Sequence, residues 1–535
     1  MWLQDNHIIY ESADPTKFLK VVPGAISVDH NGTVAAPYSL HNLQIIRYLG
    51  YVVPPPMTDE TYDWPITGRD PDGTPWRPRA HQKTMANFMA LHPRAFNLGD
   101  MGTGKTLAAL WAADFLMRQY PAGEIRCLIV APLSTLQRVW ADAVFGNFLG
   151  QRRVVVLHGT PDKRRQLLAQ PADFYVINFD GLGIGYSGDP RTPARGIYKD
   201  LCDRGDIQIA IVDEAAAYKD GTTKRHKIAR KLLAPKSYLW MMTGTPTPNG
   251  PLDAYGPARL LNNAWGESFQ SYKMRVMYKV TQFKWVPKSG AMAEARKLLS
   301  PSIRFAIADC VDLPPCTTQQ RDVEFSPAQA RAYKDMQRDL RLIVRDKTIT
   351  AVNEAVLRLK LIQISCGALY SGVDREREVH IVDAAPRIAA LREVLEQTRE
   401  KAIVFAPLTS VVHMLQKELK EFTREVVNGE TPHKVRSEIF RAFQEDESPR
   451  ILIADPGTMA HGLTLTAAST IIWYSATDKT EIYLQANKRI DRPGQVHATT
   501  IIQLASTDIE REIYRRLERN ETMQGIVLKM VRDGA

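Results

Sequence analysis

A glycine-rich segment near residue 100 has the composition of a phosphate-binding loop. The pattern GxxxxGK[ST] is met by residues 99–106, Gly-Asp-Met-Gly-Thr-Gly-Lys-Thr, and a helical stretch follows at once. Glycines let backbone N–H groups converge on phosphate oxygens, and the N-terminus of the following helix adds a positive end. The pattern predicts a nucleoside triphosphate site formed by Gly102, Thr103 and Gly104. Lys105 would neutralise the β- and γ-phosphates, and the Thr106 hydroxyl would ligate Mg²⁺.

Two later segments carry side chains that complete such a site. The apolar run IAIV ends in Asp213-Glu214, and the apolar run YLWMM ends in Thr243-Gly244-Thr245. In P-loop NTPases an acid at such a strand end completes the Mg²⁺ site, which is the role predicted for Asp213. Glu214 is placed to orient or deprotonate the attacking water. The threonine segment could couple the phosphate site to a moving neighbour, although the same residues also make a plain turn.

Two arginines near the C-terminus are candidates for contact with a γ-phosphate. Arg489 and Arg492 are three residues apart, so they share a face if the segment is helical. Arginines of a second lobe can reach across a cleft to a phosphate, as arginine fingers do. Taken alone, the pattern fits a solvated basic helix face better.

These candidates have to be positioned by parallel sheets. Apolar runs of four to eight residues, each followed by a turn and a helical stretch, recur in CLIVAP, VVVLH, FYVINF, IAIVDEA and YLWMMTG. The rhythm resumes in KAIVFAP, EVVNG, ILIADP, TIIWYS and TTIIQL. Such runs indicate parallel strands that are buried on both faces. The predicted fold class is α/β, with two parallel-sheet lobes and helical insertions.

The pattern also predicts domain limits. A small β-rich α+β domain is expected at 1–55, followed by a proline-rich linker at 56–78. Lobe 1 is expected at 79–310, with a helical, aromatic-rich insertion at 251–300. Lobe 2 is expected at 311–535, with a helical insertion at 326–370 and a C-terminal helix at 508–531.

The overall composition is that of a globular protein. The chain has 535 residues, and 69 Lys and Arg against 59 Asp and Glu give a net charge of +10. This balance permits a polyanionic partner without requiring one. The five cysteines form no CxxC pair, so a zinc ribbon or disulfide framework is not expected. No apolar stretch approaches the ~18–20 residues of a membrane span, and the N-terminus lacks a signal-peptide layout. We expect a cytoplasmic protein of a bacterium or a phage-infected cell.

The four segments, in this order, resemble a superfamily 2 helicase of the SNF2-like branch. Further matches are Arg79–Gln82 with the Q motif, 130–135 with motif Ia, 176–179 with motif Ib, 402–405 with motif IV, 460–466 with motif V and 489–495 with motif VI. The resemblance covers about residues 75–530. It implies two RecA-like parallel-sheet lobes with ATP and Mg²⁺ between them, and Gln82 and Gly462 among the nucleotide contacts. It also implies coupling through Thr243, Gly244, Thr245 and Gln495.

The resemblance further implies DNA, either duplex, forked or a four-way junction, as the partner, with no membrane association. The implied DNA contacts are Pro132, Ser134, Asn178, Thr409 and Thr464. The motor would move on such DNA in replication, recombination or repair, by branch migration, fork remodelling, annealing or unwinding. The variant motif V resembles compact phage helicases, and residues 1–55 resemble a HARP-type domain. Ala216 stands where the family usually has His, which leaves the coupling route open.

Three alternatives remain at this point. An RNA helicase of the same superfamily would share most motifs, although the RxxRxGQ form of motif VI favours DNA. A nucleotide-gated scaffold would bind ATP with little turnover. A motor subunit of a restriction or defence complex would need a nuclease partner. Basic clusters such as 224–231 either contact nucleic acid or form a solvated face. The aromatic residues of the insertion either contact nucleic acid or pack in a core.

Overall fold

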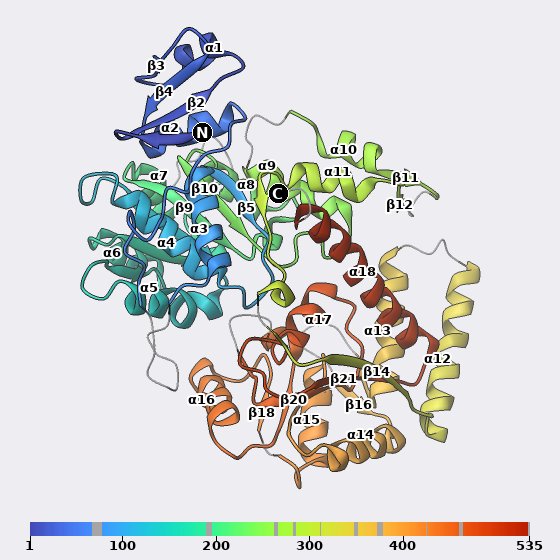
Figure 1. Cartoon of the computed structure of the whole chain (residues 1–535). Helices are drawn as coiled ribbons and strands as arrows, with labels where there is room; N and C mark the ends of the chain where they lie inside the picture. Colours follow the sequence, from blue (N-terminus) through green and yellow to red (C-terminus); the bar gives the residue numbers. More distant parts are fainter. Residues whose placement is uncertain are drawn as a thin grey trace.

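The computed structural model describes residues 1–66, 77–188, 195–261, 266–281, 285–310, 312–346, 351–371, 378–423, 425–459 and 464–532. Within these ranges, no helix is both long enough and apolar enough to cross a membrane. The chain forms a small N-terminal sheet followed by two larger parallel sheets, each flanked by helices (Figure 1).

The N-terminal unit is an antiparallel sheet with the strand order β1-β2-β4-β3, packed on two helices. Its elements are β1 (Trp2–Gln4), β2 (His7–Glu11), α1 (Pro15–Val21), β3 (Ile26–Ser27), β4 (Thr33–Pro37) and α2 (Leu40–Tyr48). Helix α2 lies on lobe 1, where the Gln44 side-chain amide donates to the Ala90 carbonyl at 2.8 Å. The following segment, predicted as a linker, buries Met57 and Tyr62 in the lobe 1 core. The described part of that segment therefore packs against lobe 1.

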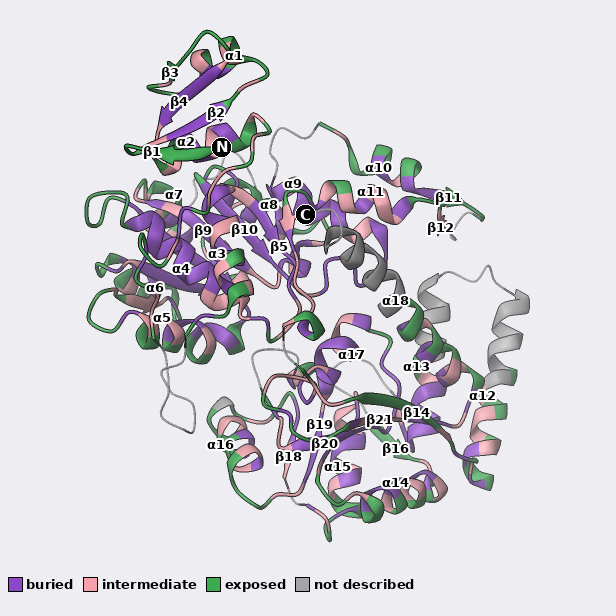
Figure 2. Cartoon of the chain, viewed as in Figure 1, coloured by how far each residue is buried: buried purple, intermediate pink, exposed green. Residues whose placement is uncertain are grey.

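Lobe 1 is a seven-stranded sheet with the order β13-β5-β10-β9-β6-β8-β7, in which all pairs are parallel. Its strands are β5 (Arg94–Asn97), β6 (Arg126–Ala131), β7 (Val154–Val156), β8 (Phe174–Asn178), β9 (Ile207–Asp213), β10 (Tyr238–Met242) and β13 (Ser302–Ile303). Its helices are α3 (Ala80–Leu91), α4 (Lys105–Met117), α5 (Asp142–Asn147), α6 (Pro161–Ala169), α7 (Gly196–Asp203) and α8 (Lys224–Leu233). The strands are buried on both faces, which explains their continuous apolar runs (Figure 2).

Residues between β10 and β13 form a helical subdomain on lobe 1. It contains α9 (Tyr255–Leu261), α10 (Phe269–Val276), the hairpin β11 (Met277–Lys279) and β12 (Trp285–Pro287), and α11 (Ala291–Leu298). Tyr272 and Val276 of α10 are fully buried in its small core. Of the aromatic residues in this insertion, Trp265 and Phe283 lie outside the described residues.

Lobe 2 is a six-stranded parallel sheet with the order β14-β21-β20-β17-β19-β18. Its strands are β14 (Cys316–Asp322), β17 (Lys401–Phe405), β18 (Val426–Val427), β19 (Ile451–Ala454), β20 (Ala468–Trp473) and β21 (Thr499–Ala505). Its helices are α12 (Pro327–Asp346), α13 (Ala351–Cys366), α14 (Ala385–Gln397), α15 (Thr409–Glu418), α16 (His433–Glu445), α17 (Thr480–Asn487) and α18 (Asp508–Arg532), with the hairpin β15 (Ala368–Ser371) and β16 (Glu378–Ile381) after α13. Helix α18 runs from lobe 2 towards α11 of lobe 1 (Figure 1).

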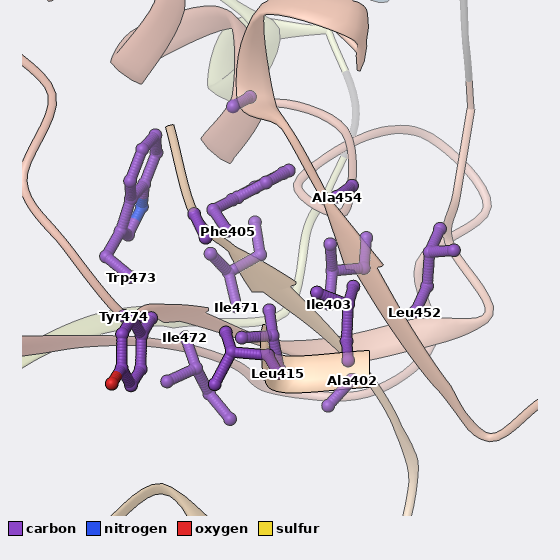
Figure 3. Packing of buried hydrophobic residues seen from close by; sticks show 14 of the residues in the cluster. Ala402, Ile403, Phe405, Leu415, Leu452, Ala454, Ile471, Ile472, Trp473 and Tyr474 are labelled. Atoms are coloured by element: carbon purple, nitrogen blue, oxygen red, sulfur yellow. The ribbon is translucent and has the colours of Figure 1, made fainter. Parts of the chain in front are cut away.

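The core of lobe 2 encloses an ion pair. Apolar side chains of β17, β19 and β20 interleave with Leu415 of α15 (Figure 3). Beside them the Arg387 guanidinium is fully buried and donates to Glu510 at 2.7 Å, to the Tyr474 carbonyl at 2.8 Å and to the Leu504 carbonyl at 2.9 Å. A buried charge of this kind is tolerated because each of its donors is partnered. The pair fixes the start of α14 to the start of α18.

The predicted fold class is confirmed. Both lobes have the RecA-like arrangement of a parallel sheet between helices, and the small α+β unit precedes them. The domain limits given by the sequence stay predictions.

Candidate nucleotide site between the lobes

The phosphate-binding loop connects the end of β5 to the start of α4. Gly102 and Gly104 have φ values of +87° and +84°, a region that glycine enters without strain. A Cβ on Gly104 would lie 2.1 Å from the side-chain amide nitrogen of Gln82. The Gln82 side-chain oxygen accepts from the Arg79 backbone N–H at 2.9 Å, which holds the Gln82 side chain at the start of α3. Gln82 is thereby positioned against the loop at Gly104. Its predicted contact with adenine stays a prediction.

Lys105 begins α4 and folds over the loop. Its ammonium donates to the Gly99 carbonyl at 2.7 Å and to the Asp100 carbonyl at 2.9 Å. Burial lowers the pKa of Lys105, and the carboxylates of Asp213 and Glu214 oppose that effect. Thr103 donates to the Asp100 carbonyl, and Thr106 occupies the first turn of α4. The Lys105 ammonium is therefore held at the loop, next to the acidic pair Asp213 and Glu214.

The acidic pair stands at the end of β9, beside the loop. One Asp213 oxygen accepts from the Trp140 indole N–H at 3.0 Å, and the other accepts from the Glu214 backbone N–H at 3.1 Å. Burial raises the pKa of Asp213, while the Trp140 hydrogen bond and Lys105 lower it. Glu214 has φ +56° and ψ +58°, the left-handed region that non-glycine residues rarely occupy. Such strain is held in place by surrounding contacts and is concentrated at functional sites.

The surroundings of the Glu214 carboxyl raise its pKa towards neutral pH. Burial, followed by the like charges of Glu481 and Asp213, raises the pKa of Glu214 to about 7. The Thr243 hydroxyl opposes this shift by donating to the carboxylate at 2.8 Å, and Thr245 lies at 3.5 Å from the same oxygen. A pKa near the working pH is what a general base requires. The predicted coupling segment is thereby brought into contact with Glu214.

The arginine pair of lobe 2 lies opposite the loop. Arg492 donates to the Thr464 hydroxyl at 3.2 Å and lies 3.7 Å from the Met101 sulfur of the loop. A Cβ on Gly102 would lie 2.9 Å from the ring of Pro493, so the two segments are in close contact. Arg489 is buried, and its pKa is lowered by burial and by Arg492. Burial also lowers the pKa of Arg492, to about 10.

The remaining predicted coupling residues differ in position. A Cβ on Gly244 would lie 3.6 Å from the Gly99 carbonyl and from the Met101 backbone nitrogen, so Gly244 adjoins the loop. The Gln495 side chain is buried and makes its hydrogen bonds to backbone groups of lobe 2, including the Ala468 and Ile490 carbonyls. In this structure Gln495 shapes the turn after motif VI. Its role in coupling stays a prediction.

The predicted nucleic-acid contacts are spread over several strand ends. Ser134 is exposed after β6 next to the buried Pro132, and Asn178 ends β8 with its side-chain oxygen accepting from Arg164 at 3.0 Å. Thr409 begins α15 in lobe 2. Thr464 contacts Arg492, which brings it next to the nucleotide cleft. Gly462, predicted to contact the nucleotide, lies outside the described residues.

Several residues that sequence reasoning did not single out also belong to the site. Trp140 donates to Asp213, and His81 contacts the Thr103 carbonyl at 3.1 Å. Lys219 of lobe 1 pairs with Glu481 of lobe 2 at 3.1 Å, close to the acidic pair. A lysine shortly after an acidic strand end and an acid at a helix start are ordinary surface patterns. Their pairing across the lobes has no signal in the sequence.

The donor set fits a hard divalent cation. Mg²⁺ prefers oxygen ligands and keeps waters and substrate phosphates in its shell, so few protein ligands are needed. The Asp213 carboxylate and the Thr106 hydroxyl are oxygen donors beside Lys105. Among the residues that the structure describes, no cluster of three or more His, Cys, Asp or Glu side chains is placed to hold a metal. The protein part of this site would therefore depend on bound phosphates to complete the shell.

Comparison with known proteins gives matches over both lobes. Residues 81–367 match the SNF2-related domain, and residues 386–494 match the helicase conserved C-terminal domain. Putative protein p41 of Acyrthosiphon pisum secondary endosymbiont phage 1 is 27% identical over 442 residues, which are 79% of this chain and 90% of that protein. A SWI/SNF-related matrix-associated actin-dependent regulator of chromatin subfamily A-like protein 1 from Xenopus tropicalis is 24% identical over 443 residues, 79% of this chain and 42% of that protein.

The chain thus spans less than half the length of the Xenopus relative. Among solved structures, the Sulfolobus solfataricus SWI2/SNF2 ATPase core in complex with dsDNA is 20% identical and covers 90% of this chain and 95% of that chain, with a TM-score of 0.39. No match tests the HARP-type resemblance of residues 1–55. Because the SNF2-related domain covers more than half of the chain and the helicase domain follows it, the chain belongs to the SNF2-related family of nucleic-acid-dependent ATPases in helicase superfamily 2.

Proposed function

We propose that this protein is an ATP-driven translocase that moves on duplex or branched DNA. The observation that carries the ATP-driven part of the proposal is the meeting of two lobes at one site. The loop of lobe 1 and Arg492 of lobe 2 are in contact across the cleft, with the Glu214 carboxyl beside them. A ligand bound between two such lobes favours the closed arrangement because only closure adds the second lobe's contacts.

Each residue of the site has a role in this proposal. Lys105 binds the terminal phosphates, and Glu214 takes a proton from the attacking water. Arg489 and Arg492 stabilise the charge that develops on the transferred phosphoryl group. Asp213 and Thr106 would hold Mg²⁺, which supplies charge neutralisation of the phosphates when bound. Loss of the terminal phosphate removes the arginine contact and lets the lobes separate.

DNA is proposed as the track because of the family and the placement of polar strand ends. Ser134, Asn178, Thr409 and Thr464 would contact backbone phosphates, which position a protein without reading sequence. The yeast relative named DNA repair and recombination protein RDH54, which is 25% identical, is consistent with DNA as the substrate. Cycles of closure and opening would then advance the lobes along the duplex.

The test is a comparison of steady-state ATPase rates with different nucleic acids at matched salt. The panel contains no nucleic acid, single-stranded DNA, linear duplex, a four-way junction and RNA, with Lys105→Ala as the inactive control. We expect the largest stimulation with duplex or junction DNA. Stimulation mainly by RNA would favour an RNA helicase instead. An absence of multiple turnover with every nucleic acid would favour a nucleotide-gated scaffold.

We also propose that residues 1–55 are an accessory DNA-binding domain. The sheet has its own small core, which includes Leu91 of α3, and α2 docks it on α3; the buried residues of the lobe 1 core begin after it, at Met57. A chain that starts at residue 56 is expected to keep its basal ATPase and lose preference for a junction over linear duplex. An unchanged junction preference would make the domain a structural cap.

A further inference from the structure

A cavity lies on lobe 1, outside the phosphate-binding loop. It has a volume of about 550 Å³ and is walled by α8, the segment between β9 and α8, and the starts of α9 and α10. These helices lie together on the side of lobe 1 next to α11 (Figure 1). Small-molecule sites occupy about 300–1,000 Å³, so the cavity is large enough for a nucleotide unit. Lys219, which pairs with Glu481 near the acidic pair, lines it, whereas the phosphate-binding loop, the acidic pair and the arginine pair do not.

Four cations line this cavity, and two of them face solvent. Lys227 and Arg230 are one turn apart on α8, and both are exposed. Within the described ranges, no acidic side chain forms an ion pair with either of them. Two other cations of α8 are engaged, since Arg225 pairs with Asp180 at 2.8 Å and Lys231 lies 5.3 Å above the Tyr186 ring. Lys227 and Arg230 are therefore two adjacent positive charges open to an anion.

The other two cations are held by the protein. Lys219 pairs with Glu481, and Arg259 donates to the Tyr255 hydroxyl at 2.8 Å. The two carboxylates of the wall are also engaged. Asp220 accepts from Thr222 at 2.6 Å and 2.8 Å, and Asp253 accepts from the Asn249 backbone N–H at 2.7 Å. The wall carries four cations against two carboxylates, so the cavity favours an anion.

One aromatic ring is presented at the edge of the same cavity. The Phe269 side chain is 39% exposed, and its ring contacts the buried Tyr255 ring edge-on at 5.2 Å between centroids. Tyr255 is fixed by its hydroxyl, which donates to the Glu267 carbonyl at 2.9 Å. A fixed ring beneath an exposed one gives a rigid platform rather than a mobile surface side chain. Exposed rings next to cations are the features with which proteins bind single strands.

We propose that this cavity binds one nucleotide unit of a single-stranded nucleic acid. The phosphate lies against Lys227 and Arg230, and the base stacks on the Phe269 ring. A duplex would place a phosphate there but could not offer an unstacked base. This inference rests on the proposed function only because it takes nucleic acid as the substrate. It adds a binding site on lobe 1 for a strand that is not part of the duplex.

The test is the affinity of the full chain for a short fluorescein-labelled oligothymidine, measured by anisotropy with an excess of unlabelled linear duplex. The pocket variant carries Lys227→Gln and Arg230→Gln. The matched control carries Lys224→Gln and Lys231→Gln, which removes two charges from the same helix outside the cavity. Each phosphate contact to a single strand contributes a salt slope of about −0.7. The pocket variant loses two such contacts. Taking its affinity as equal to that of the unmodified chain at 1 M salt, its binding at 0.1 M salt should be about 25-fold weaker than that of the unmodified chain.

The control should change the affinity by less than about twofold. A separate Phe269→Ala variant should weaken binding about fivefold or more, because stacking on an aromatic ring contributes about 1–3 kcal/mol per base. Equal losses in the pocket and control variants would overturn the proposal, as would unaltered binding in the pocket variant or no binding by the unmodified chain. The pocket variant and the matched control should both keep their duplex-stimulated ATPase. Failure of both duplex and junction DNA to stimulate the unmodified chain would instead overturn the proposed function.

Discussion

The hydrogen bond from Thr243 to Glu214 should control the pH dependence of ATP hydrolysis. The hydroxyl is buried and donates to the carboxylate at 2.8 Å, which favours the charged form. Thr243→Val keeps the branched shape and removes this donor, and with it the oxygen that accepts from the Thr245 backbone N–H at 3.0 Å. A hydrogen bond to a charged group contributes about 1.5–3 kcal/mol, and one pKa unit corresponds to about 1.4 kcal/mol. The variant should therefore raise the pKa of Glu214 by about 1–2 units.

The direction of the activity change follows from the role of Glu214 as a base. With a pKa of about 7, half of the carboxyl groups are ionised at pH 7. After a rise of about 1–2 units, the ionised fraction at pH 7 falls about 5- to 50-fold, and it recovers at higher pH. The rate on the acidic side of the profile should fall, while the rate well above the new pKa should approach that of the unmodified protein.

The assay is kcat/KM for ATP across the range from weakly acidic to alkaline pH, with stimulating DNA present. This quantity reports the pKa values of the free enzyme, and the ratio of variant to unmodified rate cancels the titration of ATP itself. Thr247→Val is the matched control, because Thr247 is buried in the same loop and its hydroxyl has no hydrogen-bond partner in the described structure. An acidic limb that does not move in Thr243→Val would refute the reasoning, as would an equal shift in the control.

Three further perturbations test other parts of the structure. Glu481→Gln removes a like charge that raises the pKa of Glu214, so the acidic limb of kcat/KM should move to lower pH, opposite to Thr243→Val; an unmoved limb would contradict this. Arg489→Ala and Arg492→Ala should keep DNA affinity and lose about 10³-fold or more in kcat, whereas unchanged rates in both would exclude the arginine-finger role. Arg387→Met leaves the Glu510 carboxylate buried without its cation, so urea denaturation should show a loss of about 3–5 kcal/mol. A combined replacement of Arg387 and Glu510 by methionine should recover most of that stability, and no recovery would argue against a charge effect.

The nucleotide loop and both parallel sheets were predictable from the sequence because their signals are local. A phosphate-binding loop needs glycines at fixed positions, and positive φ values occur at Gly102 and Gly104. A strand that is buried on both faces needs a continuous apolar run, which is how β6, β9 and β20 appear in the sequence. These requirements act within a few residues, so they leave a pattern that can be read along the chain.

The tertiary structure decided which distant groups meet. The two-residue strand β13 pairs with β5, although the two strands are far apart in the sequence. Just after β13, Arg304 donates to the Asp100 carboxylate of the loop at 3.1 Å. The Lys219–Glu481 pair joins the two lobes, and Lys227 and Phe269 line the same cavity although they are far apart in the sequence. The pKa of Glu214 depends on burial and on neighbours from three segments. Desolvation and Coulomb interactions act through space, so the sequence determined which groups could do the chemistry, and the fold determined how they are tuned.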